Sequence, residues 1–236
     1  MFPQLVAGPI VRYVDIKEQL NNKDLSYTSF YSGLRRFILG LAKKMIIANN
    51  CGYIADNIWS SELTDLSTPI AWLGIIAYTF QIYFDFSGYS DMAIGLGRML
   101  GFKFLENFNF PYISRSIREF WRRWHISLST WFRDYVYIPL GGSRRSPSRV
   151  YLNLLIVFLV TGLWHGASWN FIVWGLFHGL FIVLERVGMD KVLEKLWVPL
   201  QHLYCLLVVM LGWVFFRADD LSHGWAYVQR LSLIHI

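Results

Sequence analysis

Charged side chains are scarce in this sequence. Asp, Glu, Lys and Arg make up 16% of its 236 residues, whereas about a quarter of the residues in a soluble domain are charged. Hydrophobic residues reach 55% and aromatic residues 18%, and only two cysteines are present. The low cysteine count excludes a disulfide scaffold, and the apolar content excludes a disordered chain. The composition therefore predicts a multi-pass membrane protein.

Several motifs that carry a defined chemistry are missing as well. No spacing of Cys and His matches a zinc site, so we expect no metal. No phosphate-binding or dinucleotide glycine motif is present, and no serine has the GxSxG context of a serine hydrolase. The start of the chain has no basic region, apolar run and cleavage site, so no signal peptide is predicted.

Long stretches without Asp, Glu, Lys or Arg predict the membrane spans. Residues 66–84 and 196–216 are each long enough for one helix to cross about 30 Å of hydrocarbon. The uncharged stretch 150–184 is too long for one crossing and short for two. We therefore predict two short helices there, 150–164 and 170–186.

The junction of these two helices reads WHGASW and would lie at membrane depth. Irregular backbone is tolerated at that depth only inside protein or beside a cavity. The sequence therefore predicts a polar pocket around His165. An uncharged environment favours a neutral imidazole, which can accept a proton as a general base. The alternative is a structural histidine bonded to a backbone carbonyl at the helix break.

Two further segments are predicted to be helical. Residues 34–59 are apolar but contain two adjacent lysines, which indicates a helix whose lysines snorkel or face a cavity. Residues 88–102 are rich in glycine, which favours tight packing between helices. Asp91 needs a partner in such apolar surroundings, and Arg98 is one candidate.

The net charge of +6 is concentrated in residues 115–149, which contain eight Arg but only one Glu and one Asp. Residues 115–135 are predicted to form one amphipathic helix at a membrane interface, with His125 on its apolar face. The positive-inside rule places this segment on the cytoplasmic side. Because it adjoins the predicted spans, we expect no binding to nucleic acid. The sequence around His125, taken alone, favours a structural role for this residue. The sequence around His178 favours a role in packing.

Five long motifs resemble the membrane-bound O-acyltransferase (MBOAT) family, and within it the bacterial branch that acetylates alginate. They are FPQLVAGPIVRY, QIYFDFSGYSDMAIGLGRMLGF, ENFNFPY, REFWRRWHISLSTWFRDYVYIPLGG and GLWHGASWNFIVWGLFHG. The resemblance implies an all-α bundle of transmembrane helices, some broken or re-entrant, around a funnel. It also implies that His165 and His125 are the family's two catalytic histidines.

The same resemblance implies a fragment, because family members have about twice this length. Residues 1–230 would form the core of the fold without its first and last helices. Residues 231–236 read LSLIHI, which resembles a translated sequencing adapter, and we expect a non-native tail there. The expected location is the bacterial inner membrane.

The implied reaction moves an acyl group, acetyl in this branch, from a cytoplasmic thioester towards hydroxyls of an exported polysaccharide. The donor is expected to be acetyl-CoA with no bound cofactor, and Arg118, Arg122 and Arg123 are candidates for holding its phosphates. An extracytoplasmic SGNH-type acyltransferase is the expected partner. Two alternatives stay open: D-alanyl transfer to teichoic acid, and a non-enzymatic transporter or scaffold for polysaccharide export.

Overall fold

The computed structural model describes residues 8–20, 23 and 25–232, and every regular element in that part of the chain is helical. The α-helices are α1 (Tyr13–Ile16), α2 (Tyr27–Ala42), α3 (Asn49–Trp59), α4 (Thr68–Met99), α5 (Ile117–Arg123), α6 (Ile126–Phe132), α7 (Pro147–His165), α8 (Trp169–Leu184), α9 (Asp190–Leu193), α10 (Val198–Arg217) and α11 (Leu221–Leu231). The π-helical turns are Lys43–Ala48, Arg133–Tyr137 and Glu185–Met189. The 3-10 turns are Glu18–Leu20, Leu63–Asp65, Pro111–Ile113 and Gly142–Arg144. The predicted all-α class is confirmed.

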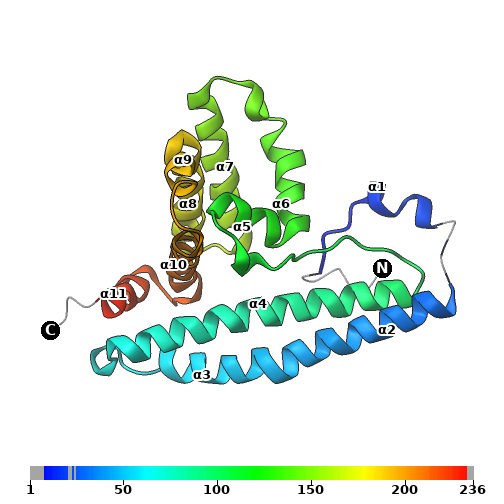
Figure 1. Ribbon diagram of the computed structural model, residues 1–236, viewed down its shortest axis with the longest axis horizontal. Helices are drawn as coiled ribbons and strands as arrows, with labels where there is room; N and C mark the ends of the chain where they lie inside the picture. The colour runs from blue at the N-terminus through cyan, green and yellow to red at the C-terminus, as the bar shows by residue number, and fades with distance from the viewer. Residues whose placement is uncertain (1–7, 21–22, 24, 233–236) are drawn as a thin grey trace.

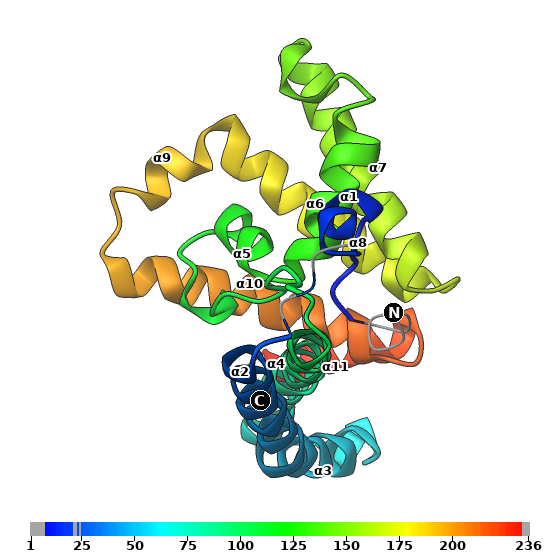
Figure 2. The ribbon, with the colours of Figure 1, turned by 90° about the vertical axis from the view of Figure 1, so that its right-hand side faces the viewer.

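The helices form two groups that cross at a steep angle (Figure 1). In the first group, α2 and α3 run beneath the long helix α4, joined to each other by the first π-helical turn. In the second, α7, α8 and α10 run across the direction of α4, α10 packs against it, and α5 and α6 lie beside them. Figure 2 looks nearly along α2 and α4 and shows the second group on one side of them. The main hydrophobic core lies where the groups meet.

Three helices are long and apolar enough to cross a membrane: Pro147–His165, Trp169–Leu193 and Val198–Arg217. They contain the predicted spans 150–164 and 170–186, and the third matches the predicted span 196–216 except for its first two residues. The uncharged stretch 150–184 does divide into two helices, and the first of them ends at His165, one residue beyond the predicted end at 164.

The predictions for residues 66–84 and 88–102 need correction. These segments belong to one continuous helix, α4, of 32 residues, which is about 48 Å long at 1.5 Å per residue. Helix α4 is long enough to cross a membrane, but it is not among the described helices whose composition is apolar enough for a span. The polar residues in its middle do not interrupt it, because cations from the neighbouring segment neutralise their charge.

Asp91 shows how this neutralisation works. Its carboxylate accepts hydrogen bonds from Arg36 of α2 at 2.8 Å and from Lys43 at 2.6 Å. The suggested pair with Arg98 is wrong, because the guanidinium of Arg98 instead lies 3.7 Å from Glu106. Carboxylates in apolar surroundings are tolerated only when paired, so these contacts allow α4 to carry Asp91 against α2.

Glycines bring α2 and α4 into close backbone contact. A Cβ atom added to Gly40 would lie 2.6 Å from the carbonyl oxygen of Gly88, and one added to Gly33 would lie 2.6 Å from that of Gly95. Both distances are shorter than real Cβ contacts, so only glycine fits. The tight packing predicted for the glycine-rich segment 88–102 is confirmed, and it follows the small-residue pattern of membrane helices.

The prediction of a single amphipathic helix over residues 115–135 is wrong. Helix α5 ends at Arg123 and α6 begins at Ile126. At the break, the backbone N–H of Ile126 donates to the carbonyl oxygen of Asn107 at 2.9 Å instead of continuing the helix. The carbonyl oxygen of Asn107, distant in the sequence, therefore replaces the local helical acceptor. The helical periodicity of the sequence alone does not reveal this replacement.

The predicted non-native tail, residues 231–236, begins at the end of α11. Leu231 is the last residue of that helix, and its carbonyl oxygen accepts a hydrogen bond from the indole of Trp72 at 3.0 Å. Residues 233–236 lie outside the described part of the chain.

We predict that Gly88→Leu lowers the free energy of unfolding by about 1–3 kcal/mol, the usual cost of overpacking a tight contact. The added side chain would meet the carbonyl oxygen of Gly40 and force α2 away from α4. Thermal unfolding in detergent measures the effect. Tyr31→Leu, which places a leucine on the exposed face of α2, is the control and should change the midpoint little. An equal midpoint in the two variants would contradict the packing described above.

Candidate active site

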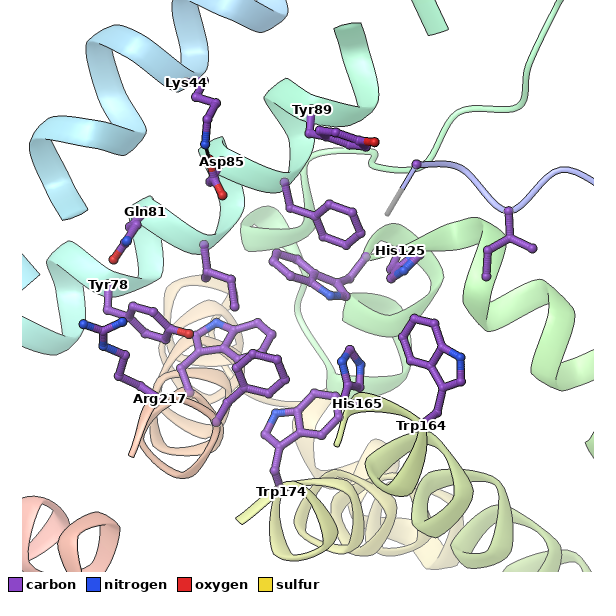
Figure 3. A pocket seen from close by; sticks show the side chains of 17 residues that line it. Lys44, Tyr78, Gln81, Asp85, Tyr89, His125, Trp164, His165, Trp174 and Arg217 are labelled. Atoms are coloured by element: carbon purple, nitrogen blue, oxygen red, sulfur yellow. Dashed lines mark hydrogen bonds and ion pairs between the residues drawn. The ribbon is translucent and has the colours of Figure 1, made fainter. Parts of the chain in front are cut away.

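A cavity of about 600 Å³ lies between the two helix groups. Its walls come from α4, from the break between α5 and α6, from the end of α7 and from α10. Figure 3 shows two chemically different ends. His125, His165 and Trp164 gather at one end, and the other end carries Lys44, Tyr78, Gln81, Asp85 and Arg217.

His165 is presented by the break between α7 and α8. It is the last residue of α7, and its imidazole points into the cavity (Figure 3). The rings of Trp164 and Trp174 have centroids 4.9 Å from that of His165, and Phe216 is at 5.2 Å, all nearly perpendicular to it. Neither ring nitrogen hydrogen-bonds to another described residue. Both are therefore available to a bound molecule.

His125 occupies the break between α5 and α6 in a left-handed backbone conformation, with φ 43° and ψ 56°. This conformation costs an L-residue roughly 1–2 kcal/mol. Two backbone hydrogen bonds to the preceding loop hold this conformation. The N–H of Asn109 donates to the carbonyl oxygen of Arg123, and the N–H of Ile126 donates to that of Asn107, each at 2.9 Å. Strain that is held in place in this way is common at functional sites.

The residue His125 is 3% exposed, and its imidazole contacts Phe86 edge-on, with ring centroids 4.7 Å apart. Its Nδ1 lies 3.1 Å from Oδ1 of Asn107. Burial, with a smaller contribution from His165, lowers the pKa of His125 to about 3. The ring is therefore neutral at pH 7 and available for hydrogen bonding to an uncharged ligand.

Glu185 anchors α5, which leads to His125. Its carboxylate is fully buried and accepts the backbone N–H groups of Ile117 at 2.6 Å and Arg118 at 3.0 Å. The hydroxyl of Tyr204 donates to the same carboxylate at 3.1 Å. These N–H groups open a helix and have no intrahelical partner. The α8–α10 layer therefore fixes the start of the short helix that ends beside His125.

The opposite end of the cavity is charged but internally neutralised. Lys44 pairs with Asp85, and Arg217 pairs with Asp56. The guanidinium of Arg217 also lies over the ring of Tyr78, 5.3 Å from its centroid. A ligand in the cavity would thus have cations at one end and imidazoles at the other.

The three arginines proposed to hold donor phosphates do not line this cavity. Arg123 pairs with Glu119 at 2.9 Å, and Arg118 lies 3.5 Å from Asp190. Arg122 is exposed and forms no ion pair with the described residues. The cations that do line the cavity, Lys44 and Arg217, were not predicted as ligand-binding residues.

His178 is fully buried behind the cavity wall. Its ring packs among aromatic residues, including Trp121 at 5.3 Å and Trp174 at 5.5 Å between centroids. This position fits the packing role expected for it. Sequence reasoning assigned no role to Asn107 or Glu185. The available signals were a polar residue directly before Phe108 in ENFNFPY and the first charged residue after the stretch 150–184.

The sequence model of the membrane-bound O-acyltransferase family matches residues 1–218. Because that match covers most of the sequence, the chain belongs to this family of membrane proteins. It is 52% identical to the probable alginate O-acetylase of Azotobacter vinelandii, over 95% of this chain and 45% of that protein. It is 43% identical to the peptidoglycan O-acetyltransferase of Helicobacter pylori, over 100% of this chain and 47% of that protein.

A more distant relative is the teichoic acid D-alanyltransferase of Bacillus subtilis, with 30% identity over 91% of this chain and 56% of that protein. The chain spans about half the length of these curated relatives. The family resemblance inferred from the motifs is confirmed.

We predict that acid destabilises the fold partly through His125. Because the pKa of His125 is about 3 in the folded state and about 6.5 in an unfolded chain, the unfolded state binds more protons between these values. Stability therefore falls as pH falls through that window. From pH 7 to 4.5 the loss is of order 3 kcal/mol, at about 1.4 kcal/mol per pH unit below 6.5.

The measurement is the difference in melting midpoint between pH 7 and pH 4.5 in detergent. His125→Gln should show a smaller difference than the wild type, because glutamine does not titrate. His223→Gln, on α11 and outside the cavity, is the control and should behave like the wild type. Equal differences in all three proteins would show that His125 takes up its proton equally in both states.

Proposed function

We propose that the complete protein containing this chain is a membrane O-acyltransferase, with the cavity described above as its reaction site. One observation carries this proposal. Two buried or half-buried imidazoles from separate helix breaks, His165 and His125, point into one cavity at the junction of two helix groups. Ionisable side chains within membrane proteins are functional by default, and a neutral imidazole is a suitable base for a hydroxyl.

The proposed chemistry assigns the proton transfers to His165. A nitrogen of His165 accepts the proton of the acceptor hydroxyl while the oxygen attacks the carbonyl carbon of an acyl thioester. The carbon–sulfur bond then breaks, and the departing thiolate takes the proton from the imidazolium. An ester and a free thiol result, and His165 returns to its neutral form. Base catalysis of this kind contributes typically about 10²–10⁴-fold.

The substrates are proposed from the relatives. Those with 43–52% identity are named for O-acetyl transfer, and the one with 30% identity is named for D-alanyl transfer. This ranking favours an acetyl group, with acetyl-CoA as the donor and hydroxyls of an exported polysaccharide as the acceptor. The proposal includes the bacterial inner membrane as the location, with the arginine-rich segment facing the cytoplasm. It also includes an extracytoplasmic SGNH-type acyltransferase as partner.

We predict that His165→Ala lowers acetyl transfer by at least about 10²-fold, the usual contribution of a general base. Transfer from labelled acetyl-CoA is measured in membranes that contain the intact protein, at matched protein levels. His223→Gln, a histidine outside the cavity, is the control and should retain wild-type transfer. Wild-type transfer by His165→Ala would refute the assignment. Absence of transfer by the wild type, combined with substrate export, would favour a transporter instead.

We propose that Arg122, and not the cations that line the cavity, binds the phosphates of the donor. Arg122 is the one member of the predicted arginine trio that is exposed and without an ion pair among the described residues. An exposed guanidinium can form paired hydrogen bonds to a phosphate. We therefore predict that Arg122→Gln raises the KM for acetyl-CoA several-fold and leaves kcat nearly unchanged.

The comparison variant is Arg217→Gln, which changes a cation inside the cavity. If Arg217→Gln raises the KM for acetyl-CoA and Arg122→Gln does not, the donor phosphates bind at the charged end of the cavity. The prediction from the arginine-rich segment would then be wrong.

A further inference from the structure

Asn107 is a buried polar residue that contacts His125 from outside the cavity. It lies in the loop between α4 and α5 and is 1% exposed. Its main chain already supports the break in the helix, because its carbonyl oxygen accepts the N–H of Ile126 at 2.9 Å. Its side chain makes four further contacts of hydrogen-bonding length, with Ser90, His125 and Ser127.

The orientation of the Asn107 amide follows from its partners. One end of the amide lies 3.2 Å from the backbone N–H of Ser127, and a backbone N–H only donates. That end is therefore the oxygen, Oδ1, which also accepts from the Ser127 hydroxyl at 2.8 Å. The other end, Nδ2, donates to the hydroxyl oxygen of Ser90 at 3.0 Å. A flipped amide would place Nδ2 against a second donor.

This orientation determines the protonation of His125. The carbonyl oxygen of Asn107 only accepts hydrogen bonds, so the facing Nδ1, 3.1 Å away, carries a proton. The Ser127 hydroxyl also lies 3.5 Å from Nδ1, but its proton goes to the nearer Oδ1 of Asn107 at 2.8 Å. A neutral imidazole has one N–H, so its Nε2 is then an acceptor with a free lone pair. Nε2 makes no hydrogen bond to a described residue, and His125 lines the cavity (Figure 3).

The ring itself is held in one plane. Phe86 meets it edge-on with centroids 4.7 Å apart, and Phe108 lies nearly parallel to it at 6.5 Å. On the cavity side, Trp164 is at 6.3 Å. Rotation of the ring to exchange its nitrogens would break the bond to Asn107 and push against these rings.

We propose that Asn107 is a positioning residue that locks His125 as the Nδ1–H tautomer, so that Nε2 serves only as a hydrogen-bond acceptor for the hydroxyl substrate. This inference rests on the proposed function, because it concerns the same cavity. It excludes a role in which His125 donates a hydrogen bond to the thioester carbonyl, since its only N–H is already given to Asn107. His165, whose nitrogens have no partner among the described residues, keeps both tautomers and can move protons.

The first test reads the tautomer directly. Membranes containing the intact protein labelled with ¹⁵N-histidine are studied by solid-state NMR at pH 7, and His125→Gln identifies the signals of His125 by their loss. We expect a protonated Nδ1 and an unprotonated Nε2. A protonated Nε2 with a bare Nδ1 would overturn the proposal, whatever the activity of the protein.

The second test uses variants of Asn107. Asn107→Leu removes the acceptor, so we expect His125 to lose its single tautomer and acetyl transfer to fall about 10²-fold, as for a misplaced reacting group. Asn107→Asp keeps an oxygen that accepts from Nδ1–H, so it should retain the tautomer and recover most of the activity. Transfer is measured from labelled acetyl-CoA to an alginate oligosaccharide.

Asn153→Leu is the matched control. Asn153 is also fully buried, and its Nδ2 donates to the carbonyl oxygen of Leu140 at 3.1 Å, outside the cavity. This variant should leave the His125 signals unchanged. If Asn107→Leu keeps both the tautomer and the rate while His165→Ala abolishes transfer, the proposed function stands and the role of Asn107 falls. If the wild type transfers no acetyl group, the proposed function falls and the nitrogen signals alone decide the tautomer.

Discussion

The structure depends on one constraint: backbone polar groups released by a broken helix within apolar protein must find partners elsewhere. Two breaks at the cavity illustrate it. At the first, around His125, the loop from Asn107 supplies the partners, and Glu185 caps the helix that leads there. Near the second, after His165, Asn170 in the first turn of α8 donates through its side chain to the carbonyl oxygen of Ala218, at the end of α10, at 2.6 Å. Both cavity imidazoles thus lie at breaks between helices, and at His125 a tertiary hydrogen bond replaces the local helical one.

The long helix α4 connects the first helix group to the cavity, because one of its faces packs against α2 and the other lines the cavity. Its glycines hold α2 at backbone contact, and ion pairs such as Asp91 with Arg36 satisfy the charges along the same interface. The opposite face of α4 forms a wall of the cavity and carries Phe86 against His125. These contacts hold the ring of His125 beside the cavity. For the proposed reaction such placement matters, because small displacements of a reacting group are costly.

Part of this arrangement was predictable from the sequence. The uncharged stretch 150–184 is too long for one crossing, and the WHGASW string supplies the break, so the division into two helices at His165 followed directly. The amphipathic pattern of 115–135 was misleading. Its apolar positions recur at helical spacing, but the helix stops at Arg123 because Asn107, 16 residues earlier, takes the N–H of Ile126. Periodicity reports which face is apolar and contains no information about a competing partner.

The sequence by itself determined the class of the protein and the identity of its two cavity histidines, because hydrophobic run length, charge and long motifs are local properties. It did not determine what His125 faces, that Asn107 orients it, or that Lys44 and Arg217 rather than the arginine trio line the cavity. Those facts arise when segments far apart in the chain meet. The physical reason is that the direction of a hydrogen bond and the pairing of a charge depend on which groups are within about 3 Å, and only the tertiary structure decides that.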